Sequence, residues 1–157
     1  MSEIILKSGE VKDIEKCLEI YFNEPFFHQY RPTRAGMEKL FHECLNDKTQ
    51  KFVMASDKKN TVLGFALFDT NGAFSRSGYL RLIVVDSHAR NMRVGESLMT
   101  FLENENQNSN GFCLLVTSTN LKAQNFYEKL GFEKVGELKN YVRIGLNEFI
   151  YFKKKNS

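Results

Sequence analysis

Hydrophobic and polar positions along the chain follow two periods. Apolar residues recur three and four positions apart in four segments, which predicts helices over 11–22, after the N-cap candidate Thr33, from Val94 to about Glu105, and over 121–130. Alternating or continuous apolar runs predict strands over 3–7, 51–56, 61–69, 79–85, 112–116, 132–138 and 141–152. The order β-α-α-β-β-β-α-β-α-β-β predicts an α/β fold in which helices lie on the faces of a mixed sheet.

The segments between these elements are polar or interrupted by proline and glycine. An aromatic, proline-containing loop is predicted over 23–32, a hairpin turn over 57–60, and a loop over 71–78. The closing strands are expected to turn near 139–140, and Gly131 is a candidate C-cap for the helix before them. No repeat, linker or low-complexity segment divides residues 1–157, which predicts a single domain.

Composition narrows the class of protein further. The 157 residues are 42% hydrophobic and 26% charged, as in soluble globular domains, and no apolar run is long enough to span a bilayer. The net charge of +3 is too small to indicate a nucleic-acid partner. Mild basicity alone leaves a nucleic-acid-binding domain open as an alternative function. The amino-terminal residues lack a signal-peptide pattern, so a cytoplasmic protein without a membrane partner is expected.

The three cysteines do not form a recognisable ligand or disulfide pattern. Cys17, Cys44 and Cys113 are widely spaced, and no CxxC or Cys/His spacing accompanies them, so no metal site is predicted. Cys17 and Cys44 fall on apolar helical faces and are expected in the core.

A strand-to-helix turn carries the first candidate chemistry. Residues 90–95, RNMRVG, follow the apolar strand 79–85 and open a helix. Backbone N–H groups at a helix start attract anions, and Gly95 allows a ligand to approach closely, so a phosphate site is one interpretation. An ordinary turn with solvated arginines is the other. The P-loop and dinucleotide-binding glycine patterns are both absent, which argues against those nucleotide sites.

A second segment, 120–132, changes this balance. Together with Arg90-x-x-Arg93-x-Gly95, the pattern Asn120-x-x-Ala123-x-x-Phe126-Tyr127-x-x-x-Gly131-Phe132 resembles the two signatures of the GNAT superfamily of N-acetyltransferases. The element order fits that family from Ile4 to Phe152. The departure is Arg93, which stands where the family usually has its first glycine. We expect the arginine to be tolerated because its position should already be helical, where glycine is not needed.

The resemblance implies a function and a set of residues. Acetyl-CoA would be the co-substrate, with its pantetheine arm between the separating strands 79–85 and 112–116 and its pyrophosphate on the turn. The implied cofactor-binding residues are Ile83, Val84, Val85, Arg90, Asn91, Met92, Arg93, Val94, Gly95, Glu96, Ser97, Asn120, Ala123, Phe126 and Tyr127. Tyr127 is the implied catalytic acid, which protonates the departing thiolate.

The general base stays open at this level. Strand 79–85 has no acidic residue, so Glu24, His28, Asp69 or a water chain are the alternatives, whereas Asp86 and His88 are expected to serve local hydrogen bonds. The acceptor would be a primary amine of a small molecule or peptide. Its site is expected to be framed by the aromatic loop with Phe26, Phe27 and Tyr30, by loop 71–78 and by the closing strands. The same aromatic rings could instead cap the core.

Two further alternatives concern activity and assembly. The chain could be a non-catalytic module that binds acyl-CoA without transferring the acyl group, because a strand carboxylate is missing and Arg93 replaces glycine. The family resemblance also makes a homodimer plausible, with the segment 146–152 as a candidate exposed edge.

Overall fold

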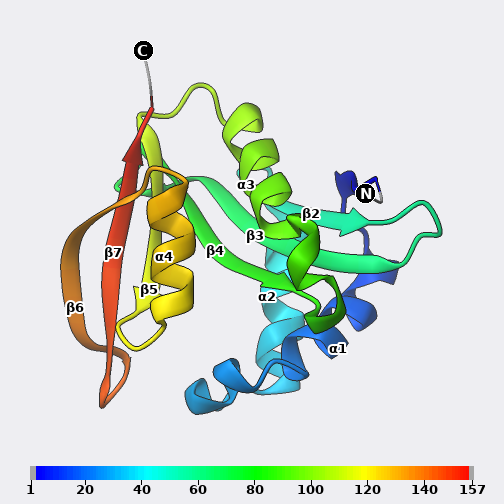
Figure 1. Cartoon of the computed structure of the whole chain (residues 1–157), viewed down its shortest axis with the longest axis horizontal. Coiled ribbons are helices and arrows are strands. Elements are labelled where there is room, and N and C mark those ends of the chain that lie inside the picture. Colours follow the sequence, from blue (N-terminus) through cyan, green and yellow to red (C-terminus); the bar gives the residue numbers. More distant parts are fainter. Residues whose placement is uncertain (1–2, 156–157) are drawn as a thin grey trace.

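A computed structural model describes residues 3–155; the outermost two residues at each end of the predicted domain lie outside this range. Within it, seven strands form one mixed sheet in the order β1-β2-β3-β4-β5-β7-β6 (Figure 1). The strands are β1 (Ile5–Ser8), β2 (Gln50–Ser56), β3 (Val62–Ala73), β4 (Ser77–Val85), β5 (Gly111–Thr117), β6 (Glu133–Arg143) and β7 (Leu146–Lys154). The predicted α/β mixed sheet is confirmed.

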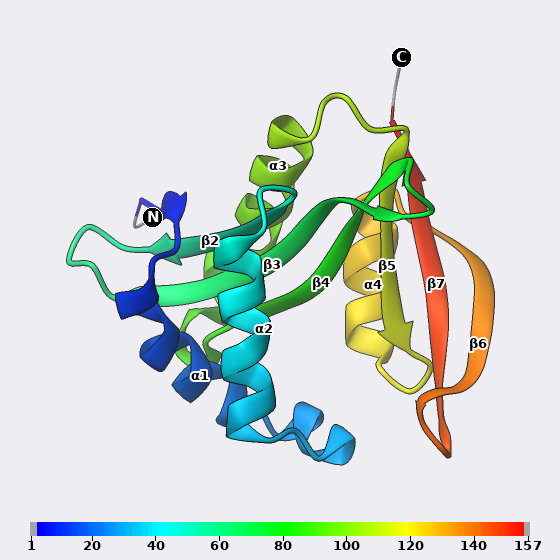
Figure 2. The ribbon, with the colours of Figure 1, turned by 180° about the vertical axis from the view of Figure 1, so that it is seen from behind.

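Helices cover both faces of this sheet (Figures 1 and 2). One face carries α1 (Ile14–Phe22) and α2 (Arg34–Asn46), and the other carries α3 (Val94–Glu105) and α4 (Leu121–Lys129). Short 3-10 segments η1 (Val11–Asp13), η2 (Pro25–Tyr30) and η3 (Ser87–Met92) lead into or out of them. No helix within residues 3–155 is long and apolar enough to cross a membrane.

Alternation along the central strands supplies two cores at once. Phe52 and Met54 of β2 pack under α1 and α2, whereas Val53 and Ala55, one residue along, pack under α3. Because successive side chains of a strand point to opposite faces, a continuous apolar run is what a strand covered on both faces requires. Cys17 and Cys44 lie in the core below α1 and α2, as predicted.

The parallel strands β4 and β5 pair over only part of their length. Gly78, Tyr79 and Leu80 align with Phe112, Cys113 and Leu114, and no further β4–β5 pair follows. Beyond this point β4 stays on β3, whereas β5 stays on β7 as far as Thr117. The two strands therefore diverge toward their carboxyl ends, which is visible in Figure 2.

Three local predictions are wrong. The loop expected over 71–78 is a tight hairpin, in which β3 runs to Ala73 and Phe74 and Ser75 turn the chain at φ 58° and 56°. Positive φ at both central residues is the type I′ pattern that suits hairpin twist, but this turn usually selects Asn-Gly, so the sequence carries no signal for this turn type. The turn expected near 139–140 lies instead between Arg143 and Leu146, at Gly145 with φ 91°.

The third error concerns the exposed edge. Segment 146–152 belongs to β7, which pairs with both β5 and β6 and is therefore interior. The edge at this end of the sheet is β6. Its register shifts between Leu138 and Arg143, where Asn140 takes φ 52°, so the strand continues through the position at which a turn was expected.

Candidate active site

Backbone groups of β4 are left without a strand partner where β5 departs. The N–H of Asp86 donates to the carbonyl of Leu63 on β3 at 2.8 Å. Because N–H groups alternate sides along a strand, Val84 also faces β3, whereas the N–H and C=O groups of Ile83 and Val85 point toward the departed β5. Within residues 3–155 no strand pairs with this side of β4 beyond Leu80. An extended ligand arm could take the hydrogen bonds that a strand would have made.

The turn after β4 leads directly to uncapped helical donors. Asp86 caps η3 by accepting from the His88 N–H, and Arg93 then precedes α3 without a side-chain cap bond. Ser97 donates through its hydroxyl and its N–H to the Arg93 carbonyl, which closes the first turn. In the described part of the chain, the N–H groups of Val94, Gly95 and Glu96 have no acceptor, as expected at a helix start. Together with the helix dipole they favour an anion.

Arg93 corrects the expectation about this turn. Its backbone is left-handed, at φ 60° and ψ 30°, and it lies just before α3 rather than inside its first turn. This is the region that glycine adopts freely and other residues adopt at a cost. A glycine would therefore fit here better than arginine. The arginine side chain is exposed, and its nearest charged partner is Glu96 at 3.8 Å.

Replacing Arg93 by glycine is expected to raise the free energy of unfolding by about 1 kcal/mol, because the left-handed cost disappears. The lost pair with Glu96 subtracts little, since both side chains are largely exposed. Urea denaturation followed by circular dichroism measures the change. Arg93→Ala is the matched control: it also removes the charge but keeps a Cβ, so it should not gain stability. Equal gains in both variants would contradict the backbone explanation.

Arg90 and Glu24, separated by 66 residues, form an ion pair. Glu24 also caps η2 by accepting from the Phe26 N–H at 3.3 Å. This pair ties the η2 segment to the turn before α3. Glu24 is a candidate general base and Arg90 is a candidate phosphate ligand. In this structure the two candidates bind each other.

The second motif contacts the first through Phe126. A Cβ placed on Gly95 would lie 3.1 Å from the Phe126 ring, so the absence of a side chain at Gly95 lets α4 approach the start of α3. Asn120 caps α4 by accepting from the Ala123 N–H at 3.1 Å. One lone pair of its oxygen is therefore used within the helix start, and its amide nitrogen could donate to a ligand. Met92 packs against the core, Val94 is buried, and Asn91 is exposed.

Tyr127 lies in the core below α4 with 6% of its surface exposed. Its ring packs edge-on against Phe126 and Phe132, with centroids 5.0 and 5.7 Å away. Its hydroxyl makes no hydrogen bond to residues 3–155, and the hydroxyl oxygen is not completely buried. Burial raises the pKa of Tyr127 above its usual value, which keeps the phenol protonated at neutral pH and makes it a weaker acid than an exposed tyrosine. An unengaged, protonated hydroxyl is what a proton donor requires.

The remaining base candidates are held by local contacts. His28 Nε2 lies 2.9 Å from the Phe22 carbonyl, and Asp69 accepts from the Asn71 N–H at 3.0 Å. Asp69 also pairs with Tyr79 in the register, near the closed end of the β4–β5 pair. Asp86 and His88 bond each other, which confirms their expected local role.

The predicted frame of the acceptor site is only partly assembled. Phe27 stacks on Tyr21 with ring centroids 4.5 Å apart and packs onto the core below α1, so this ring caps the core. Tyr30 instead reaches the closing strand β7. The segment 71–78 does not frame the site: Arg76 accepts from the Asn110 N–H, beside the start of β5, whereas the strands diverge at their other ends.

A cluster that the sequence analysis did not identify lies where Tyr30 meets β5 and β7. The Tyr30 hydroxyl donates to Glu148 Oε1 at 2.5 Å and also bonds the Thr117 hydroxyl. Thr117 and Glu148 are register partners at the end of β5. Burial, and next the hydrogen bond to Glu148, raise the pKa of Tyr30 above its usual value. The only sequence signal in this region is the alternation of apolar residues along β7. That pattern does not indicate that Glu148 is buried.

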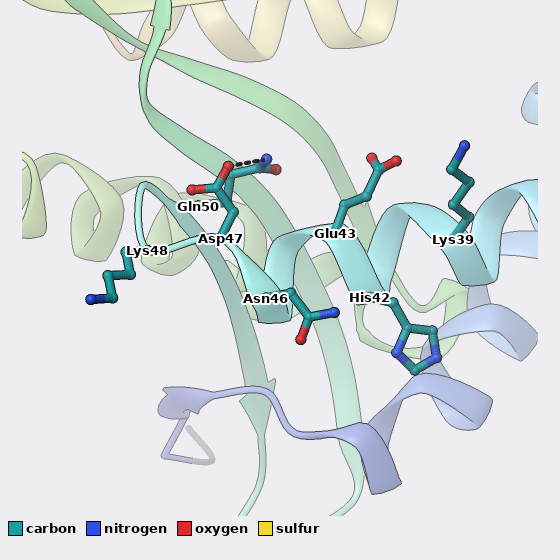
Figure 3. Close-up of a pocket in the computed structure, with 7 residues that line it drawn as sticks. All are labelled: Lys39, His42, Glu43, Asn46, Asp47, Lys48 and Gln50. Carbon is teal, nitrogen blue, oxygen red and sulfur yellow. Dashed lines mark hydrogen bonds between the residues drawn. The ribbon is translucent and has the colours of Figure 1, made fainter.

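A shallow hollow elsewhere on the surface does not contain any sequence-predicted site residue. It is formed by the end of α2 and the start of β2 (Figure 3) and is lined by Lys39, His42, Glu43, Asn46, Asp47, Lys48 and Gln50. Figure 3 shows His42 and Asn46 on one side of the helix and Lys39 and Glu43 on the other, so these side chains do not converge. Within residues 3–155 no group of three or more potential ligands is arranged to hold a metal ion.

The sequence profile described as the Acetyltransferase (GNAT) family matches residues 13–132. The chain belongs to the GNAT acetyltransferase family. No curated protein matches it. Solved structures share its fold, among them a Desulfovibrio desulfuricans protein assigned to the GNAT family, with 18% identity, TM-score 0.82, and coverage of 97% of this chain and 99% of that one. The Escherichia coli ribosomal-protein-S18-alanine N-acetyltransferase has 19% identity, TM-score 0.80, and coverage of 99% and 96%.

A third structure carries a ligand. A Bacillus anthracis protein assigned as a streptothricin acetyltransferase, in complex with acetyl coenzyme A, has 19% identity, TM-score 0.76, and coverage of 98% of this chain and 99% of that one. At these identities the structural likeness supports the fold, and the family profile supports an acetyltransferase.

Proposed function

We propose that this GNAT protein transfers the acetyl group of acetyl-CoA directly to a primary amine of a small molecule or peptide. The observation that carries the proposal is the divergence of β4 from β5 beside the uncapped start of α3. The unpaired groups of Ile83 and Val85 would bind the pantetheine arm, and the N–H groups of Val94, Gly95 and Glu96 would bind the pyrophosphate. The Bacillus anthracis structure with acetyl coenzyme A supports this choice of co-substrate.

The reaction needs a new C–N bond and the loss of a C–S bond. The lone pair of the neutral amine attacks the thioester carbonyl, whose oxygen takes up negative charge that unpaired β4 N–H groups would stabilise. Collapse of this intermediate expels the coenzyme A thiolate, and Tyr127 donates its proton to the sulfur. The second amine proton restores the tyrosine. The net products are the amide, free coenzyme A and one proton for each ammonium consumed.

Isothermal titration with acetyl-CoA, coenzyme A and ATP tests the cofactor half of the proposal. Saturable binding of acetyl-CoA and coenzyme A, with ATP much weaker, is expected. The alternative is a module that binds acyl-CoA without transferring the acyl group, and the absence of a carboxylate on β4 favours it. Thioester consumption with a panel of primary amines then separates a transferase from such a module. Absence of acetyl-CoA binding would contradict both.

A homodimer is the second part of the proposal. The β6 edge carries exposed apolar side chains, among them Val135 and Val142 at 60% and 55% exposure and Tyr141 at 62%. An unpaired strand edge with apolar side chains favours association with another strand. We expect sedimentation at tens of micromolar to give the mass of a dimer, and Val135→Lys to shift it toward the monomer. A monomeric mass for the unaltered chain would contradict the dimer.

A further inference from the structure

Glu148 is a buried carboxylate without a cation. Its exposed fraction is 5%, and no lysine or arginine of residues 3–155 forms an ion pair with it. Oε1 accepts from Tyr30 at 2.5 Å and lies 3.5 Å from the Thr117 hydroxyl. Oε2 is enclosed and has no hydrogen-bond partner among residues 3–155. One end of the carboxylate is therefore satisfied by the fold and the other is not.

A buried carboxylate with one unpaired oxygen lowers the stability of the folded protein. A buried charge is normally paired, and a buried polar atom is normally hydrogen-bonded, because desolvation otherwise goes uncompensated. An apolar side chain at this position would avoid the cost. A buried polar atom without a protein partner can be satisfied by a bound water or by a ligand. A carboxylate oxygen only accepts hydrogen bonds, so the missing ligand must be a donor, and a cation would balance the charge.

The position of Glu148 relates it to the diverging strands. It pairs with Thr117, the last residue of β5, at the end of β5 that has left β4, although β7 lies on the other side of β5 from β4. Phe149 and Tyr151 pack into the core below α3 and α4, so alternation directs Glu148 to the opposite face. The start of α3, where the phosphates are proposed to bind, lies on the first face. An amine that reaches the thioester from the opposite face would meet Glu148.

We propose that Glu148 binds the ammonium group of the acceptor through Oε2, once the side chains that enclose this atom move aside, and takes one proton from it. This inference rests on the proposed transferase function and specifies its substrate class: a primary amine that is cationic at neutral pH, with an apolar body. The N–H bond breaks as the Glu148 O–H bond forms, which leaves the lone pair free to attack. The Tyr30 and Thr117 oxygens can accept the other ammonium hydrogens. Phe26, whose ring centroid is 6.4 Å from that of Tyr30, would contact the apolar body.

Phenethylamine is the probe, and 2-phenylethanol is its neutral isostere. Each is titrated into the protein–coenzyme A complex by isothermal calorimetry. We expect phenethylamine to bind the unaltered chain about tenfold to a hundredfold more tightly than Glu148→Gln, which removes the charge but preserves the shape and the acceptor for Tyr30. Phenylethanol should bind both weakly and equally. Glu133→Gln is the matched control, because this exposed β6 carboxylate contacts no polar side chain that the structure describes, and it should behave as the unaltered chain.

The outcomes separate this inference from the function on which it rests. Acetyl-CoA binding by Glu148→Gln at the affinity of the unaltered chain shows that the variant is folded and that the cofactor half stands. Equal phenethylamine affinity in Glu148→Gln and the unaltered chain overturns the ammonium site. Lack of saturable phenethylamine binding to the unaltered complex overturns the apolar-amine class. Tyr30→Phe keeps the carboxylate but removes its partner, so it should weaken phenethylamine binding less than Glu148→Gln; a greater loss would assign the role to Tyr30.

Discussion

Replacing Tyr127 by phenylalanine is expected to lower turnover roughly tenfold or more while acetyl-CoA still binds. The change removes one oxygen, which makes no hydrogen bond to residues 3–155, so the core around Phe126 and Phe132 should keep its packing. The thiolate then leaves without a donor in the site. Because only the later step is impaired, kcat should fall and the dissociation constant for acetyl-CoA should not change.

Tyr21→Phe is the matched control for this experiment. Tyr21 is also a buried tyrosine, but it lies in the core below α1, against Phe22 and Phe27. Loss of a buried hydroxyl should affect the two proteins similarly if the effect is one of packing. Steady-state thioester consumption, with binding measured separately by calorimetry, gives both quantities. Unchanged turnover in Tyr127→Phe, or an equal loss in Tyr21→Phe, would remove Tyr127 from the acid role.

The order of helices and strands could be predicted because each element carries its own period. The stripe in α3 and the continuous apolar run of β5 both follow from local burial, and the structure places them as expected. The hairpin at Phe74 and Ser75 could not be predicted, since neither residue type favours positive φ. There the pairing of β3 with β4 on either side determines the turn. The same applies to β6, whose register shift replaces the expected turn.

For the candidate site too, the parts built from residues close in sequence could be predicted, and the parts built from distant residues could not. Contiguous motifs identified the turn before α3 and the face of α4, because their residues are near one another in sequence. Glu148 and Tyr30 are 118 positions apart, and Thr117 is 31 positions from Glu148. Their proximity depends on how η2 crosses the end of β5, which no local pattern records. The backbone at Arg93 was missed for another reason: the family position suggested a helix, whereas the change from η3 to α3 requires a left-handed residue.

Gly95→Asp is expected to weaken acetyl-CoA binding about a hundredfold, or ~2.7 kcal/mol, while the protein stays folded. A carboxylate in the first turn of α3 would lie among the N–H groups proposed for the pyrophosphate and would repel it. The same charge interacts favourably with the helix dipole, so it should not destabilise α3 electrostatically. Opposite effects on binding and on helix electrostatics are the signature of an anion site.

The added Cβ has an effect of its own, because it would lie 3.1 Å from the Phe126 ring. Gly95→Ala introduces that contact without the charge and is therefore the matched control. We expect the alanine variant to lose only a few-fold in affinity, since the ring can shift by a few tenths of an ångström. Calorimetry measures both affinities, and thermal denaturation confirms folding. If alanine and aspartate weaken binding equally, Gly95 serves the packing of α4 against α3, and the phosphates must bind elsewhere along the turn. A large excess loss with aspartate locates negative charge of the ligand at the start of α3.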